Sequence, residues 1–220
     1  MELPSVAPLR PTPRETTSEV SPEPHHRPLS KVKPVAPTNT GRILGVDIEN
    51  KPLWYAGGDF VYDNVVCFTP KFVGELEGET VWLDWRKTDQ ELVSLVQPFR
   101  QMIEEADALL GHNFKHDWRG LRAVFNHLKQ PFLPARPIID TMRCIPSGMP
   151  RSLEWLCDTF NLGEKPHIPA RTWVAAIERY EPWAIDAVKE RNRLDVVLTE
   201  RLYEREKEIG WITPRIRPKA

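Results

Sequence analysis

The sequence predicts an α/β fold in which helices flank a mixed sheet. Three observations lead to this expectation. Short β-branched and aromatic runs fill much of residues 42–85. The apolar spacing then changes, over residues 91–107, to the three-and-four pattern of a helix. Short apolar runs at 108–112 and 137–142 follow and alternate with helical segments, which is typical of strand-helix-strand units.

Length and composition favour one domain. The chain has 220 residues, and its hydrophobic content of 40% is enough to form a core. Its 30 Lys and Arg residues nearly balance its 31 Asp and Glu residues, which gives a net charge of -1. Because no overall positive field is present, nucleic acid would have to bind through local basic patches.

The spacing of the cysteines and the lengths of the apolar runs bear on where in the cell the protein is expected. Cys67, Cys144 and Cys157 are scattered without CxxC spacing, which supports neither a disulfide framework nor a zinc knuckle. No apolar run reaches the length of about 18 residues expected of a membrane span, and the N-terminus lacks the apolar core of a signal peptide. We therefore expect a cytoplasmic protein that does not contact membranes.

Composition also divides the chain into three parts. Residues 1–40 are rich in Pro, Ser, Thr, Glu and Lys and have no apolar period, which predicts a disordered Pro-rich arm. The periodic patterns occupy residues 41–209, the predicted domain. Residues 210–220 form a basic tail that either adds phosphate contacts or is inert.

The strand predicted at residues 42–50 carries two acids at its end. Side chains alternate along a strand, so Asp47 and Glu49 point the same way, roughly 6 to 7 Å apart. Two like charges on a half-buried surface repel, and a divalent cation would remove that cost. The alternative is that the strand simply ends there and that both acids are hydrated.

Three further runs follow, at residues 53–57, 64–69 and 80–85, and their residue types predict an antiparallel meander beside the first strand. A helix over 91–107 and a core strand at 108–112 come next. The helical pattern after residue 113 then places Asp117 on the same stripe as Leu121, Val124 and Leu128. A core-facing Asp is costly unless it is paired or bound to a metal, although the helix dipole also favours an Asp in a first turn.

The last third predicts a core strand at 137–142, a helix at 151–160 that ends near Gly163, and a loop at 165–171. The final helix begins at Trp173 or Pro182 and runs to Glu208. Within it, one buried stripe contains Val188, Arg191, Asp195, Leu198 and Leu202, so Asp195 is a second core-facing helical acid.

Four inward carboxylates can converge only if the helices flank the first strand, which right-handed crossovers allow. An all-oxygen cluster suits Mg²⁺ or Mn²⁺ better than zinc. Two such ions about 4 Å apart stabilise in-line displacement at phosphorus, so the pattern favours phosphodiester hydrolysis.

Three short motifs stand out: Asp47-Ile48-Glu49, Gly111-His112-Asn113 followed by Asp117, and Asn192-Arg193-Leu194-Asp195-Val196. They resemble the exonuclease motifs of the DEDD superfamily of 3′-to-5′ exonucleases. The segments at 139–141, 152–156 and 161–165 also resemble connecting elements of that family, especially in versions from phages and prokaryotes. The resemblance covers roughly residues 42–206. It implies a ribonuclease-H-like fold with a mixed five-stranded sheet flanked by helices, and two bound Mg²⁺ or Mn²⁺ ions.

The resemblance also implies roles for individual residues. Asp47 would bridge both ions, Glu49 and Asp195 would complete the site of the ion that activates water, and Asp117 would hold the ion near the leaving 3′ oxygen. The backbone around Ile48 would lie near the terminal nucleotide, with Asn113 in support. Lys115 belongs to a group of basic residues that would screen the charge of an entering strand. For Asp140, we expect a strand-end role that caps the next turn.

One position departs from the family pattern. Members usually carry a Tyr four residues before the last Asp, or a His five before it, to orient or deprotonate the water. Arg191 and Glu190 stand at those positions. Arg191 cannot act as a base at neutral pH, so it would contact a phosphate or pair with a carboxylate. Glu190 has the chemistry of a base but lies off the Asp195 stripe.

The leading hypothesis is therefore a metal-dependent exonuclease that acts on single-stranded 3′ ends, with DNA favoured, in replication, repair or degradation. Its location would be the cytoplasm, that of a bacterial host if a phage encodes it, and the Pro-rich arm would contact a replication protein. The rival hypothesis is a weakly active or inactive nucleic-acid-binding or polymerase-accessory module. A third is an RNA-processing nuclease or structure-specific endonuclease.

Overall fold

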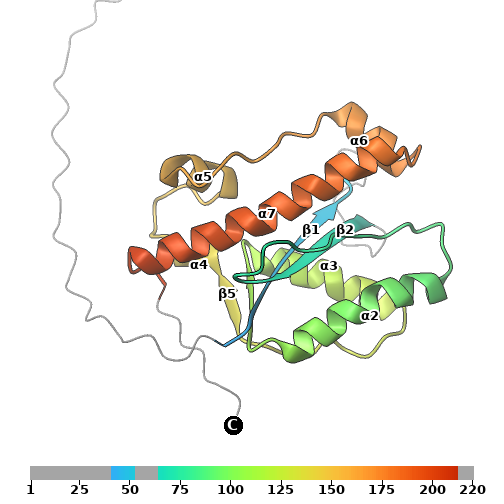
Figure 1. Ribbon diagram of the computed structural model, residues 1–220, viewed down its shortest axis with the longest axis horizontal. Coiled ribbons are helices and arrows are strands. Elements are labelled where there is room, and N and C mark those ends of the chain that lie inside the picture. The colour runs from blue at the N-terminus through green and yellow to red at the C-terminus, as the bar shows by residue number, and fades with distance from the viewer. Residues whose placement is uncertain (1–40, 53–63, 213–220) are drawn as a thin grey trace, which may run out of the picture. The chain divides into compact units, whose positions relative to one another are not determined.

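A computed structural model describes residues 41–52 and 64–212 of the chain. In that part of the chain, five strands form one mixed sheet in the order β3-β2-β1-β4-β5, and helices lie on both of its faces (Figure 1). The elements are β1 (Ile43–Asn50), β2 (Val65–Phe72), β3 (Val81–Trp82), α2 (Asp89–Glu105), β4 (Ala108–Gly111), α3 (Phe114–His127), β5 (Ile138–Asp140), α4 (Thr141–Cys144), α5 (Leu153–Phe160), α6 (Ala170–Ile177) and α7 (Pro182–Glu208).

Strand β1 is the centre of the sheet. It pairs antiparallel with β2, with Asp47 opposite Thr69, and parallel with β4, with Ile43 opposite Ala108. Strand β3 continues the antiparallel arrangement on β2. The predicted meander is therefore confirmed for these strands, while the strand predicted at 53–57 lies outside the described residues.

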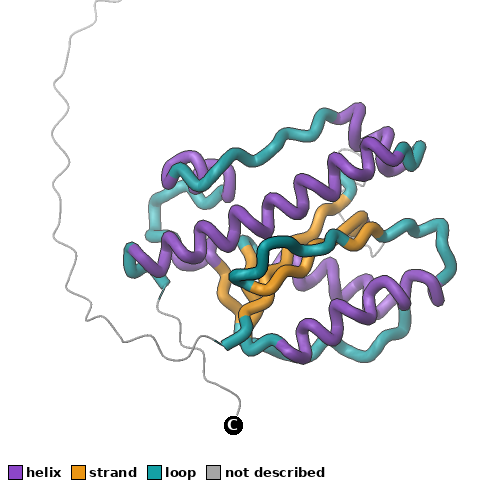
Figure 2. The backbone as a smooth tube through the Cα atoms, in the orientation of Figure 1, coloured by secondary structure: helices purple, strands orange, loops and turns teal. Residues whose placement is uncertain are grey.

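The two faces of the sheet have separate partners. Leu44, Val46 and Ile48 of β1 pack in one apolar cluster with α2 and α3. The alternate residues of β1 point to the opposite face, where α7 crosses the sheet (Figures 1 and 2). There an added Cβ on Gly45 would lie 3.3 Å from a methyl group of Val196, so the small residue permits close packing of α7 on β1. The side chains of Asp47 and Glu49 belong to this α7 face.

The helices begin and end near their predicted bounds. A capping box between Thr88 and Glu91 starts α2, two residues before the predicted start. The side chain of Ser152 caps α5, and Asn161 ends it with a left-handed φ of 53°. The final helix starts at Pro182, the later of the two predicted positions, because Trp173 belongs to the separate helix α6.

A strand within the predicted range 137–142 is confirmed, but it is shorter than predicted and does not lie in the core. Strand β5 spans three residues at the edge of the sheet, and its Ile138 is 52% exposed. Within residues 41–52 and 64–212, β5 pairs with β4 alone and forms an edge of the sheet. The chain turns into α4 at Thr141. The run predicted at 80–85 is likewise shorter, with only Val81 and Trp82 in β3.

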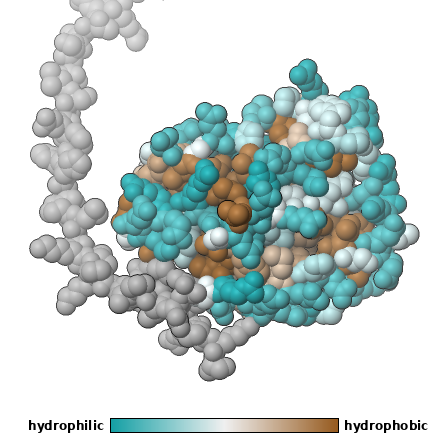
Figure 3. Space-filling model, viewed as in Figure 1, coloured by the Kyte–Doolittle hydropathy of each residue, from teal (hydrophilic) through white to brown (hydrophobic). Residues whose placement is uncertain are grey.

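One face of the described domain carries both hydrophilic and hydrophobic side chains. In the view of Figure 3, hydrophilic side chains cover much of the described domain and hydrophobic ones gather in separate patches between them. No helix in the described part of the chain is both long enough and apolar enough to cross a bilayer. The large hydrophobic side chains that are exposed in this part of the chain are Leu76, Phe132, Ile138 and Trp183.

Candidate metal centre

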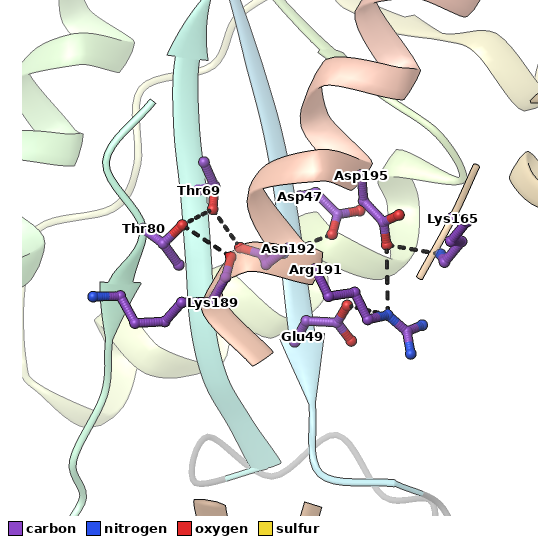
Figure 4. A network of polar contacts seen from close by, with 9 residues as sticks. All are labelled: Asp47, Glu49, Thr69, Thr80, Lys165, Lys189, Arg191, Asn192 and Asp195. Atoms are coloured by element: carbon purple, nitrogen blue, oxygen red, sulfur yellow. Dashed lines mark hydrogen bonds and ion pairs between the residues drawn. The ribbon is translucent and has the colours of Figure 1, made fainter. Parts of the chain in front are cut away.

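Three of the predicted acids meet where α7 crosses β1. Each of Asp47, Glu49 and Asp195 offers an oxygen atom, and these atoms lie within 4.8 Å of one another (Figure 4). Asp47 and Glu49 come together because they are two residues apart on one strand. Asp195 joins them because it lies on the buried stripe of α7, where its exposure is 2%.

Asp117 comes from the other side of the sheet. It lies in the first turn of α3 with an exposure of 4%, so the expected core-facing position is observed. It is not one of the three residues whose oxygens lie within 4.8 Å of one another. Its charge nevertheless raises the pKa of Asp47, and the charge of Glu49 raises the pKa of Asp117. The fourth acid is therefore close enough for electrostatic coupling, but it stands apart from the compact trio.

Burial and mutual repulsion make these acids reluctant to ionise. The pKa of Asp47 is well above its ordinary value because of burial first and then the charges of Asp117 and Asp195. Asp117 has a raised pKa because of burial and then the charge of Asp140. Burial also raises the pKa of Glu49 to about 7, although Arg191 acts in the opposite direction. A bound cation would favour the ionised forms of these three carboxyl groups.

A chain of hydrogen bonds fixes Asp47. The side-chain amide of Asn192 donates to Asp47 Oδ2 at 2.7 Å. The hydroxyl of Thr69 donates to the amide oxygen of Asn192 at 2.6 Å, and the hydroxyl of Thr80 lies 2.6 Å from that of Thr69. Asn192 is fully buried. Sequence patterns alone assign Asn192 no role, although its position three residues before Asp195, on the same side of α7, is a signal that it lies near the acids.

Two positively charged side chains contact the acidic cluster. Nε of Arg191 lies 3.0 Å from Glu49 Oε1 and 3.9 Å from Asp195 Oδ2. Nζ of Lys165, from the loop between α5 and α6, lies 2.7 Å from the same Asp195 oxygen. Of the two roles left open for Arg191, the structure shows pairing with carboxylates. Sequence reasoning missed Lys165 because nothing in a loop sequence shows which distant acid it contacts.

The donor atoms suit a hard cation. Asp117 Oδ2 and Asp195 Oδ1 are buried and have no hydrogen-bond partner among the described residues. Buried polar atoms without partners are costly, and a cation that accepts their lone pairs would offset the cost. All these donors are oxygen, which fits Mg²⁺ or Mn²⁺. The residues present therefore fit the predicted cofactor.

The remaining predicted residues surround this cluster. Asn113 is exposed and adopts a left-handed conformation immediately before α3, and Lys115 is exposed on the first turn. The side chain of Ile48 packs in the core, which leaves its backbone for any contact with a substrate. Glu190 pairs with Arg193 at 2.6 Å, and its side chain is 51% exposed.

The expectation for Asp140 was wrong. Its side chain makes no capping bond to the first turn of α4. Instead, Asp140 Oδ1 accepts a hydrogen bond from the backbone N–H of Asn113 at 2.9 Å. The parallel pairing of β4 with β5 places Asp140 opposite Gly111, so its carboxylate reaches the turn that leads from β4 into α3. Asp140 thus supports the segment that carries Asp117.

Solved structures match this chain to different extents. They include the family B DNA polymerase from the hyperthermophilic archaeon Pyrobaculum calidifontis, with a TM-score of 0.57 and 19% identity over 79% of this chain. A Saccharomyces cerevisiae apo Pan2 pseudoubiquitin hydrolase-RNA exonuclease module in complex with AAGGAA RNA matches 80% of this chain with a TM-score of 0.34 and 15% identity. This chain covers 25% of the polymerase chain and 33% of the Pan2 chain.

The polymerase likeness bears on the fold. Together with the mixed five-stranded sheet, it confirms the predicted ribonuclease-H-like class. No protein-family model and no curated protein matches the chain. The narrower phage or prokaryotic proofreading subtype stays a prediction.

Proposed function

We propose that the protein is a metal-dependent 3′-to-5′ exonuclease that releases nucleoside monophosphates from single-stranded ends, with DNA as the favoured substrate. The observation that carries this proposal is the convergence of Asp47, Glu49 and Asp195, with Asp117 nearby, on a ribonuclease-H-like fold. Two Mg²⁺ or Mn²⁺ ions held by these acids would supply activation of a water molecule and stabilisation of charge on the leaving oxygen.

The protein's own residues hold the Asp47 carboxylate in position. Asn192 holds the Asp47 carboxylate in one orientation, and Thr69 in turn holds the Asn192 amide. Because these partners are buried between β1, β2 and α7, they restrict rotation of the Asp47 side chain. A catalytic carboxylate supported in this way keeps its geometry without reorganisation during the reaction.

Contacts with the nucleic acid are proposed at the edge of this cluster. Lys115 is exposed on the first turn of α3, two residues before Asp117, where its charge would attract a phosphate. Asn113 and the backbone of Ile48 would contact the terminal nucleotide. The guanidinium of Arg191 is 22% exposed and has donors suited to phosphate oxygens. A replication protein that contacts the Pro-rich arm stays a prediction, because residues 1–40 lie outside the described part of the chain.

The direct test is a time course on 5′-labelled single-stranded DNA and RNA oligonucleotides with Mn²⁺, Mg²⁺ or EDTA. We expect a metal-dependent ladder that shortens from the 3′ end and disappears in Asp47→Ala. Asp186→Ala is the matched control, because Asp186 is exposed on the same helix as Asp195, and it should retain the activity. Absence of cleavage by the folded parent protein with every metal would overturn the proposal for these substrates.

A second candidate function is a nucleic-acid-binding or polymerase-accessory module without efficient chemistry. The observation that favours it is the pairing of Arg191 with Glu49, where the resemblance implies a Tyr or a His near the water. General-base assistance contributes about 10² to 10⁴ in rate, so its loss would leave a slow enzyme. Binding of single-stranded oligonucleotides without cleavage, measured by fluorescence anisotropy, would support this candidate.

A further inference from the structure

The carboxylates of Glu49 and Asp195 share a cation that belongs to the chain. Nε of Arg191 lies between them, at 3.0 Å from Glu49 Oε1 and 3.9 Å from Asp195 Oδ2 (Figure 4). The side chains of these two acids are only 11% and 3% exposed. Without Arg191, two buried negative charges would face each other, and Lys165 would be the one cation left beside them in the described part of the chain.

Charge contributes most to the attraction between Arg191 and Glu49, and a side-chain hydrogen bond adds a smaller part. Asn192 differs, because it is a neutral amide that donates a hydrogen bond to Asp47. A side chain that is held mainly by its charge can be displaced by another cation.

The same position is needed by a metal ion. A Mg²⁺ ion would sit about 2.0 to 2.1 Å from its carboxylate oxygens. An ion that binds Glu49 and Asp195 would therefore lie within a few ångströms of the Arg191 guanidinium, where two positive charges in a buried site repel strongly. Arg191 in its observed position would therefore weaken the binding of an ion to these two acids.

We propose, on the basis of the metal site in the proposed function, that Arg191 is a built-in counter-ion that competes with a divalent cation for Glu49 and Asp195. In the metal-free protein it neutralises the pair and keeps the site assembled. Metal entry requires the side chain to leave Glu49. Because Arg191 is partly exposed and emerges from the middle of α7, it can move toward solvent without unfolding the helix. Arg191 is a positioning residue that sets the affinity of the site for metal.

The test compares Mn²⁺ binding by isothermal titration calorimetry in the parent protein and three variants. Arg191→Met removes the charge but keeps the length of the side chain, and we expect Mn²⁺ to bind at least about tenfold more tightly. Arg191→Lys keeps a competing cation and should stay near the parent. Arg193→Met is the matched control on α7, because Arg193 pairs with Glu190 away from the cluster, and it should not alter Mn²⁺ affinity.

Thermal unfolding gives a second readout that is independent of nuclease activity. In EDTA, Arg191→Met should melt at a lower temperature than the parent, because Glu49 and Asp195 lose their counter-ion. Saturating Mn²⁺ should raise its melting temperature by more than it raises that of the parent.

If Arg191→Met does not fold, NMR spectra of the parent protein still test the competition. The Arg191 Nε–H signal in NMR spectra, assigned by its loss in Arg191→Lys, should shift on titration with Mg²⁺ while that of Arg193 stays in place.

These outcomes separate the inference from the exonuclease proposal. Unchanged or weaker Mn²⁺ binding in Arg191→Met, or an Arg191 signal that Mg²⁺ does not move, would overturn the competition. Tighter Mn²⁺ binding together with no cleavage of DNA or RNA would leave the competition standing and remove the exonuclease function. Failure of both the parent and Arg191→Met to bind Mn²⁺ would overturn the competition and the metal site together.

Discussion

Replacement of Glu206 by Gln should stabilise the protein at neutral pH. Glu206 lies on α7 and is fully buried, and neither of its carboxylate oxygens has a hydrogen-bond partner among the described residues. Burial, and then the charge of Asp140, raises its pKa to about 8. A buried carboxyl group of this kind stays protonated in the folded protein at a pH where the unfolded chain would release its proton.

The direction and size of this stabilisation follow from the difference in proton binding by Glu206 between the folded and unfolded states. Between the ordinary pKa of 4.5 and the folded pKa of about 8, the folded state binds more protons than the unfolded state, so stability falls as pH rises. The cost is absent below the ordinary pKa and reaches its full size near the folded one. At pH 7 the penalty is on the order of 3 kcal/mol, from about 1.4 kcal/mol for each pH unit above 4.5.

Urea unfolding of the parent and Glu206→Gln from pH 4 to pH 9 measures this penalty. The two proteins should have similar free energies of unfolding at the acid end, where Glu206 is neutral in both states, and the variant should gain steadily toward pH 8. Glu204→Gln is the control, because Glu204 pairs with Lys207 and its side chain is 47% exposed. A difference between parent and Glu206→Gln that does not change with pH would refute the reasoning.

Three other substitutions test separate parts of the structure. Asn192→Ala removes the bond to Asp47 and should lower the free energy of unfolding by about 1 to 3 kcal/mol in urea titrations. Gly111→Ala would place a Cβ 2.4 Å from the buried ring of Phe114, and should cost about 1 to 3 kcal/mol in the same assay. Thr88→Ala removes the capping box of α2 and should cost about 1 kcal/mol, visible as a lower melting temperature by circular dichroism.

Local sequence patterns predicted most of the elements and the acids. The alternation in β1 places Asp47 and Glu49 on one face, and the stripes of α3 and α7 place Asp117 and Asp195 toward the core. These predictions succeed because side-chain direction repeats with a fixed period within one element. The short edge strand β5 was predicted as a core strand because an apolar run does not reveal how many neighbours a strand has.

The contacts between distant elements were decided only by the tertiary structure. The sequence marked Arg191 as unusual, but the fold places it between Glu49 and Asp195. The fold also brings Lys165 from a loop to Asp195, and Asn192 from α7 to Asp47. Periodicity within an element determines which side chains point inward, while the packing of α7 across β1 determines which of them meet. Sequence patterns therefore identified four acids that point inward, and the packing of distant elements set which cations and amides lie beside them.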